Sequence, residues 1–356
     1  MVSKRRLVPF FIIILCKLAA VIFQSNSIFY CKIIFFGSPP FSAYILEQLH
    51  INFNVVAVVC PLDNEKGRGR KITAPAVKQK AEELKIEVLQ PENLKAESFV
   101  TALKNLNADL FIVVAFRMLP EIVWKMPKFG CVNLHTSLLP NYKGAAPINW
   151  VLINGEKQTG ITTFFINDKI DGGNIILQEK IELDGKITAA SLHNIMMKNG
   201  TNLLLETIDN LKNNSIKEIV QKAKSSDKIA PKLKKELLRI DWNKSSTEIH
   251  NLIRGLSPCL EDNTILKDVA ICPSAWFYLL VENEKQLRVK LLLSNLEKIE
   301  HSSEIPSIVT DNKTHLKIVV KDGFISILKL QMEGKKAMDI KSFLAGFQME
   351  NSFTVC

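Results

Sequence analysis

The sequence predicts an α/β protein made of a Rossmann-like, doubly wound domain followed by a small, OB-like β-barrel. From residue 32 onward, short β-branched runs alternate with amphipathic stretches, a pattern typical of a parallel sheet with crossover helices. After residue 256, short alternating segments follow one another without helices between them, which is typical of antiparallel barrels. The 356 residues are enough for two separate cores.

The first domain, residues 32–212, is expected to contain five strands and four helices. The strand candidates are apolar and β-branched, and the helix candidates follow turn residues or repeat apolar side chains at helical spacing. We expect strands at 32–36, 54–59, 109–115, 130–135 and 161–166, and helices at 39–50, 74–84, 97–106 and 190–212.

The second domain is expected over residues 236–350, after a basic linker at 213–235 that is rich in Asn, Ser and Lys. It should begin with one helix around 245–256. The alternating segments that predict its strands lie near 275–281, 287–294, 315–320 and 324–331.

The first 31 residues are set apart from this fold. Basic residues 4–6 precede an apolar run from Leu7 to Phe23, as in a signal peptide, but Lys17 interrupts the run and no small-x-small site precedes Lys32. A single run of this length with an internal charge is also a poor membrane helix. We therefore interpret residues 1–31 as an apolar extension, such as a misassigned start, and expect no stable membrane association.

The cysteine pattern predicts a reducing compartment. Seven cysteines are scattered along the chain without a C-x-x-C pair, which argues against a disulfide framework and against a zinc site. We therefore expect a cytoplasmic protein without a metal. For the oligomeric state, a monomer is the default expectation.

The overall charge points to a polyanionic partner. Lys and Arg outnumber Asp and Glu by 46 to 36, a net charge of +10. The alternative is a bias of the organism toward Lys, Asn and Ile, and composition alone does not separate the two.

Three polar residues form the strongest candidate site. Asn133 and His135 lie two residues apart at the carboxyl end of a predicted strand, so both project from one face where open α/β sheets bind ligands. An amide and an imidazole that converge can donate hydrogen bonds to the oxyanion of an acyl transfer. Asp171, ahead of two glycines, is the preferred orienting acid over Asp168. Taken singly, His135 could also be a surface strand-end residue and Asp171 a turn residue.

The motifs around these residues resemble the methionyl-tRNA formyltransferase family, over about residues 32–347. They are N-L-H-T-S-L-L-P at 133–140, Y-K-G-A-A-P-I at 142–148, G-I-T-T-F-F at 160–165 and I-D-G-G-N-I at 170–175. The resemblance implies that Asn133, His135 and Asp171 are catalytic. It also implies that the loop Ser137, Leu138, Leu139 and Pro140 holds the reduced folate.

The implied reaction moves the formyl group of 10-formyltetrahydrofolate to the amino group of methionyl-initiator-tRNA for translation initiation. Asn133 and His135 would stabilise the oxyanion, while Asp171 would orient His135, favour its charged form and help to relay a proton. The N-x-H motif with a distant Asp is shared by other 10-formyltetrahydrofolate enzymes, so it identifies the reaction and not the acceptor. A sugar nucleotide or purine precursor is the alternative acceptor.

Two further features bear on tRNA. The glycine-punctuated loop at 62–71 resembles a tRNA-reading loop of the family and carries Arg68, Arg70 and Lys71, although such a charge run can also be merely solvated. Segments of the second domain, which faces tRNA in relatives, also resemble the family, and Lys335 and Lys336 are candidate phosphate contacts. The matching segments are 239–243, 253–258, 331–338 and 343–346. Lysines of the linker are further candidate phosphate contacts, at 222, 224, 228, 232, 234 and 235.

Departures and rival functions complete the prediction. Residues 259–273 form an insertion relative to the family pattern, which we interpret as a tolerated surface loop. A nucleic-acid-binding protein with an inactive first domain is the rival from another class, against which the intact trio argues. A dinucleotide-binding oxidoreductase is disfavoured because residues 36–40 lack a G-x-G-x-x-G turn.

Overall fold

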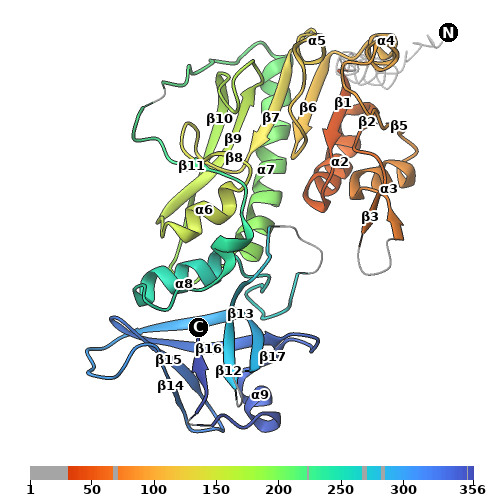
Figure 1. Ribbon diagram of the computed structural model, residues 1–356. Coiled ribbons are helices and arrows are strands. Elements are labelled where there is room, and N and C mark those ends of the chain that lie inside the picture. The colour runs from red at the N-terminus through yellow and green to blue at the C-terminus, as the bar shows by residue number, and fades with distance from the viewer. Residues whose placement is uncertain (1–30, 67–70, 223, 267–270, 282–284, 351) are drawn as a thin grey trace, which may run out of the picture.

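The computed structural model describes residues 31–356 except 67–70, 223, 267–270, 282–284 and 351. Two units are stacked along the long direction of the molecule in Figure 1, with helix α8 (Ser246–Gly255) lying between their sheets. The predicted fold class, a Rossmann-like unit followed by a small antiparallel barrel, is confirmed.

The first unit is built on a seven-stranded sheet in the order β10-β9-β7-β6-β1-β2-β5. The five strands from β5 to β7 pair in parallel, and all of them except β5 lie where the sequence predicts strands. The strands are β1 (Lys32–Gly37), β2 (Asn54–Val59), β5 (Glu87–Leu89), β6 (Leu110–Val114), β7 (Cys131–His135), β9 (Gln158–Phe165) and β10 (Ile175–Glu182).

The remaining two strands depart from the predicted parallel arrangement, and β10 was not predicted as a strand. β9 runs antiparallel to β7, and β10 runs antiparallel to β9. Residues 136–157 join β7 to β9 at the same edge of the sheet, so no crossover is made and the chain runs back. β9 consequently ends beside the start of β7, where the Ile166 amide donates to the Cys131 carbonyl.

Helices cover both faces of this sheet. Along β1, Ile33 and Phe35 face one core and Ile34 and Phe36 face the other, all fully buried. The first face carries α2 (Pro40–Asn52), α3 (Ala76–Glu83), α6 (Pro147–Ile153) and the long α7 (Ala189–Lys212), and the second carries α4 (Glu97–Leu106) and α5 (Glu121–Trp124).

The segment predicted as a linker forms ordered contacts with the first unit. In Figure 1 it leaves α7 and passes around the β10 edge of the sheet. Ile219 pairs with Ile175, and β11 (Ile229–Ala230) pairs in parallel with β8 (Lys143–Gly144). We call residues 216–230 the strap.

The second unit is an antiparallel sheet in the order β14-β15-β16-β13-β12-β18, with β17 added to β16. The end strands β14 and β18 contact each other, so the sheet is nearly closed around its own apolar core. Its elements are β12 (Ala275–Val281), β13 (Lys285–Lys298), β14 (Ser307–Thr310), β15 (Leu316–Val320), β16 (Gly323–Met332), β17 (Met338–Asp339), β18 (Thr354–Val355) and α9 (Ile340–Gly346).

Helix α8 joins the two units. It begins with a capping box between Ser245 and Glu248 and buries Ile249 and Ile253 in the barrel core. Its Arg254, only 4% exposed, donates to the backbone carbonyls of Ile187 and Leu152 in the first unit. Among the described residues, no helix is both long and apolar enough to cross a membrane.

Candidate active site

A cavity of about 1290 Å³ opens at the carboxyl end of β7. Small-molecule pockets usually occupy about 300–1,000 Å³, so this one has room for more than one small substrate. Its wall combines the first turn of α2, the ends of β6 and β7, the segment before α6, and residues of the 259–273 insertion. The site thus lies where ligands bind in open α/β sheets.

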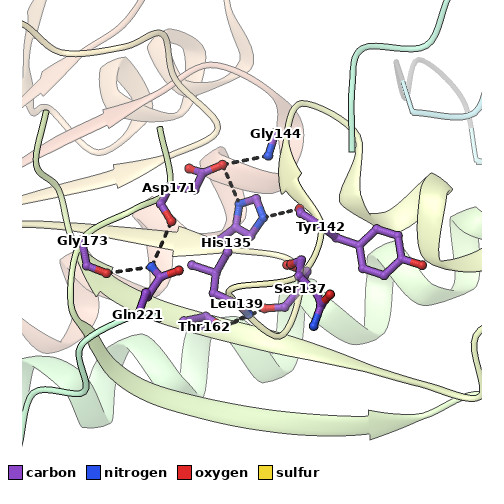
Figure 2. A network of polar contacts seen from close by, with 10 residues as sticks. His135, Ser137, Leu139, Tyr142, Gly144, Thr162, Asp171, Gly173 and Gln221 are labelled. Carbon is purple, nitrogen blue, oxygen red and sulfur yellow. Dashed lines mark hydrogen bonds and ion pairs between the residues drawn. The ribbon is translucent and has the colours of Figure 1, made fainter. Parts of the chain in front are cut away.

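Asn133, His135 and Asp171 all line this cavity. The first two project from the same face of β7, and Asp171 comes from the loop between β9 and β10. Asp171 Oδ2 lies 3.8 Å from His135 Nδ1, and the side chains are 14% and 7% exposed. All three residues that the sequence analysis singled out therefore line one cavity. Figure 2 shows the contact between His135 and Asp171.

The backbone after β7 fixes both members of the His–Asp pair. His135 Nε2 lies 2.9 Å from the carbonyl oxygen of Tyr142, and because a carbonyl only accepts, Nε2 carries the hydrogen. The Gly144 amide donates to Asp171 Oδ2 at 2.9 Å. Nδ1 is then the ring nitrogen that faces Asp171. Over the described residues, no hydrogen bond occupies the Asn133 carboxamide, which leaves its donors open to the cavity.

Gly144 must be a glycine in this arrangement. Its φ is +123°, and a Cβ would stand 2.6 Å from the carbonyl oxygen of Ala230 in the strap. The close approach of the strap is what places the Gly144 amide opposite Asp171.

The predicted folate loop lies beside the cavity and not in its wall. Ser137 and Leu139 are buried, and none of Ser137, Leu138, Leu139 and Pro140 lines the cavity. The loop is held by polar contacts: the Thr162 hydroxyl donates to the Ser137 carbonyl at 2.7 Å, and Gln178 donates to the Leu139 carbonyl at 3.0 Å. It forms the turn that follows His135 and supports the end of β7.

The structure describes only part of the predicted tRNA contacts. Arg68 and Arg70 fall outside the described residues, and of Lys71 only the backbone is described. It begins β4 (Lys71–Thr73), which pairs with β3 (Asn64–Lys66) as a hairpin whose stem reaches the cavity wall. Lys335 and Lys336 are exposed in the turn between β16 and β17.

The sequence analysis did not anticipate two parts of the wall. His193 of α7 lines the cavity, and burial holds the pKa of its imidazole below the ordinary value. Its apolar neighbours made it resemble a core position. The insertion contributes Leu266, Ile271 and Cys272, and Asn149 donates to the Ile271 carbonyl at 2.7 Å. Burial raises the pKa of Cys272 to about 12, so the residue is a thiol and a poor nucleophile.

Comparison with known proteins finds matches over both units. The family model described as formyl transferase matches residues 31–208, and the formyl transferase C-terminal domain matches residues 232–348. A methionyl-tRNA formyltransferase of Flavobacterium johnsoniae is 44% identical over 325 residues, covering 91% of this chain and 98% of that protein. One of Bacteroides thetaiotaomicron is 42% identical over 328 residues, covering 90% and 97%.

A solved structure shares the fold at lower identity. The N-formyltransferase of Helicobacter canadensis, in complex with folinic acid and dTDP-3-aminofucose, aligns with a TM-score of 0.56 and 21% identity, covering 83% of this chain and 98% of that one. The resemblance inferred from the sequence motifs is confirmed by the full-length relatives. The chain belongs to the methionyl-tRNA formyltransferase family.

Proposed function

We propose that this protein transfers the formyl group of 10-formyltetrahydrofolate to the free amino group of methionyl-initiator-tRNA. The observation that carries the proposal is the convergence of Asn133, His135 and Asp171 on one large cavity. The family membership and the match of both domains to formyl transferases support it. We further propose that it acts in the cytoplasm as a monomer, without stable membrane association and without a metal.

We propose a task for each member of the trio. As the amine attacks, the new C–N bond forms and the formyl oxygen becomes negative, and the unoccupied Asn133 amide is placed to donate to it. Since the Tyr142 carbonyl occupies Nε2 of His135, Nδ1 is the nitrogen that takes a proton from the attacking amine. The same nitrogen returns the proton to the departing folate nitrogen as the old C–N bond breaks.

Asp171 supports this proton transfer electrostatically. Its carboxylate lies 3.8 Å from Nδ1, where it stabilises the positive ring that forms during the transfer. Its other role is to orient the ring of His135, and it can do so because the Gly144 amide holds the carboxylate in place. We propose that Ser137 to Pro140 shape the donor site through the turn that fixes the end of β7.

The acceptor is the part that an assay must decide. Purified protein is incubated with 10-formyltetrahydrofolate and either methionyl-initiator-tRNA or methionyl-elongator-tRNA, at low and high salt. We expect formylation of the initiator form, with an apparent KM for tRNA that rises with salt. Equal turnover of both tRNAs, or of neither, would contradict the proposal and direct the search to a sugar nucleotide or purine acceptor.

The trio is tested by removing one side chain at a time. We expect Asn133→Ala to lower kcat at least about a hundredfold, because one oxyanion donor contributes about 3 kcal/mol to the transition state. We expect a loss of at least about a hundredfold from His135→Ala as well, because a positioned general acid–base group contributes about 10²–10⁴-fold. Binding of tRNA, measured by anisotropy, should persist. Asp168→Asn is the matched control, since Asp168 is exposed in the same loop as Asp171. Near-full activity of either alanine variant would remove the assignment.

A further inference from the structure

Gln221, in the strap, contacts the loop that carries Asp171. Its Nε2 lies 2.9 Å from the carbonyl oxygen of Asp171 and 2.7 Å from that of Gly173. Figure 2 shows this amide on the backbone side of Asp171, opposite the contacts that the carboxylate makes with Gly144 and His135. The strap thus returns to the catalytic loop from a point 50 residues further along the sequence.

The chemistry of this contact leaves little freedom. An amide nitrogen has two hydrogens, and the carbonyls of Asp171 and Gly173 accept both. Reversing the amide would place Oε1 against two acceptors, so the orientation is determined. Oε1 itself is buried and has no hydrogen-bond partner among the described residues. Within the part of the chain that the structure describes, both donors of this glutamine bind carbonyls of one loop, so the side chain acts on that loop.

The loop needs such support. It leaves β9 beside the start of β7 yet must bring Asp171 back to His135 at the other end of that strand. Asp171 accordingly has φ +47°, a left-handed conformation that glycine adopts freely and that residues with a side chain adopt at a cost, which is smaller for Asp and Asn than for most others. Hydrogen bonds to the carbonyls of Asp171 and Gly173 hold the peptide units on both sides of the turn.

We propose that Gln221 is a positioning residue for formyl transfer, acting through Asp171. The strap then supports the His–Asp pair from two directions. Gln221 fixes the backbone of Asp171, while Ile229 and Ala230 pair with β8 and place the Gly144 amide that binds its carboxylate. This inference rests on the proposed function only for its kinetic test.

The kinetic test compares two substitutions with a control from the same strap. Gln221→Met keeps the length and removes both donors, and Gln221→Glu keeps the shape and presents oxygens to two carbonyls. We expect kcat to fall at least about tenfold in each, since a displacement of about 1 Å can lower the rate about a hundredfold. The KM values should stay within about twofold. Glu218→Ala removes the exposed contact of Glu218 with Asn174, on the same loop, and should keep the wild-type kcat.

A double-mutant cycle separates positioning from a merely structural role. If Gln221 acts through Asp171, Gln221→Met should lower kcat no more than about twofold in an Asp171→Asn background. A loss of the same size in both backgrounds would overturn the inference. So would wild-type kcat in both Gln221 variants, or an effect confined to KM.

A measurement on the free protein makes the test independent of activity. In Gln221→Met the Gly144 amide should exchange its hydrogen faster, because Asp171 Oδ2 is no longer held against it. The melting temperature should remain close to that of the wild type. Unchanged exchange at Gly144 would contradict the positioning role. If the wild type did not transfer formyl groups, and Gln221→Met still exchanged the Gly144 amide hydrogen faster than the wild type, only the proposed function would be contradicted.

Discussion

Asp171 combines a strained backbone with a buried functional carboxylate. The positive φ costs of the order of 1–3 kcal/mol in general, and such conformations persist only where neighbouring contacts hold them. At Asp171 two contacts do this: Gln221 donates to its backbone carbonyl, and the Gly144 amide donates to its carboxylate. Two glycines follow directly in the sequence. The position of one oxygen relative to His135 therefore depends on several distant parts of the chain.

Gly173 provides a residue-level test of this dependence. A Cβ at this position would stand 1.6 Å from the carbonyl oxygen of Phe165, so the loop must move. We expect Gly173→Ala to lower kcat at least about tenfold and the free energy of unfolding by about 2 kcal/mol, as in other overpacked sites. Steady-state kinetics and urea unfolding measure the two effects.

Gly185→Ala is the matched control for Gly173. Nothing lies within 4 Å of a Cβ built at Gly185, which is in the connection between β10 and α7. Wild-type activity and stability are expected there. If Gly173→Ala behaved in the same way, the loop would be more adaptable than its contacts indicate.

At the residue scale, the sequence predicted the groups that converge and missed the groups that hold them. The spacing of Asn133 and His135 on one strand was sufficient to place them on one face. The glycines after Asp171 favoured it over Asp168. Gln221 gave no signal, because its partners are backbone carbonyls, which have no identity in a sequence. The roles of the trio and of Ser137 to Pro140 stay predictions until the variants are measured.

At the scale of elements, α8 binds to both units through buried polar side chains. His250 lies 3.0 Å from the Ser294 hydroxyl of β13 through Nδ1 and 3.1 Å from the Gly185 carbonyl through Nε2. Burial, and secondarily the charge of Arg254, hold the pKa of His250 below its ordinary value against the opposing effect of the Gly185 carbonyl. His250 is therefore neutral in the folded protein near neutral pH.

This lowered pKa predicts how stability depends on pH. Below an ordinary pKa of about 6.5 the unfolded chain binds a proton at His250 before the folded chain does, so stability falls as the pH falls. The slope from one such group is at most about 1.4 kcal/mol per pH unit. We expect His250→Gln to lose stability less steeply than the wild type between about pH 7 and 5 in urea unfolding.

The control for this experiment is a second histidine. Burial also lowers the pKa of His193. We therefore expect stability to fall most steeply with falling pH in the wild type, and less steeply when either His193 or His250 is replaced by Gln. Parallel pH profiles for the wild type and His250→Gln would show that α8 carries no such linkage.

Element prediction succeeded where apolar periodicity was strong and failed where direction or context decided. Every strand and helix expected in the two units has a counterpart, including α7 and α8. The direction of β9 was wrong, because a buried apolar strand has the same pattern whichever way it runs. The elements that were not anticipated include the strands β5, β10 and β14, the helices α5, α6 and α9, and the β8–β11 pair. Most of them are short segments, which depend on their neighbours for stability.

At the scale of the whole molecule, the positive charge and the cavity point to two parts of one function. The net charge of +10 and the exposed Lys335 and Lys336 favour a polyanion, while the cavity holds the reacting groups. The predicted tRNA contacts on the hairpin and on the β16–β17 turn stay predictions. Their contribution is electrostatic and therefore measurable through salt.

We expect the affinity for tRNA to fall steeply with salt, and less steeply when lysines that neutralise phosphates are replaced. In the double variant Lys335→Gln, Lys336→Gln, the slope of log Kd against log salt should decrease by about one for each phosphate that is no longer neutralised. Anisotropy titrations at several salt concentrations measure it. Lys104→Gln, exposed on α4 far from the second unit in Figure 1, should leave the slope unchanged. Equal slopes in all proteins would exclude both lysines as phosphate contacts.

The path of the strap affects how the two units could be recombined. Residues 216–230 follow the last helix of the first unit, yet they complete the surroundings of its reacting groups before the second unit begins. A hybrid that joins this first unit to the barrel of a relative should therefore be spliced after residue 230. A splice at residue 212 would replace the strap that contacts Asp171 and Gly144 with the corresponding segment of the relative. We expect both halves of such a hybrid to fold and its kcat to be low.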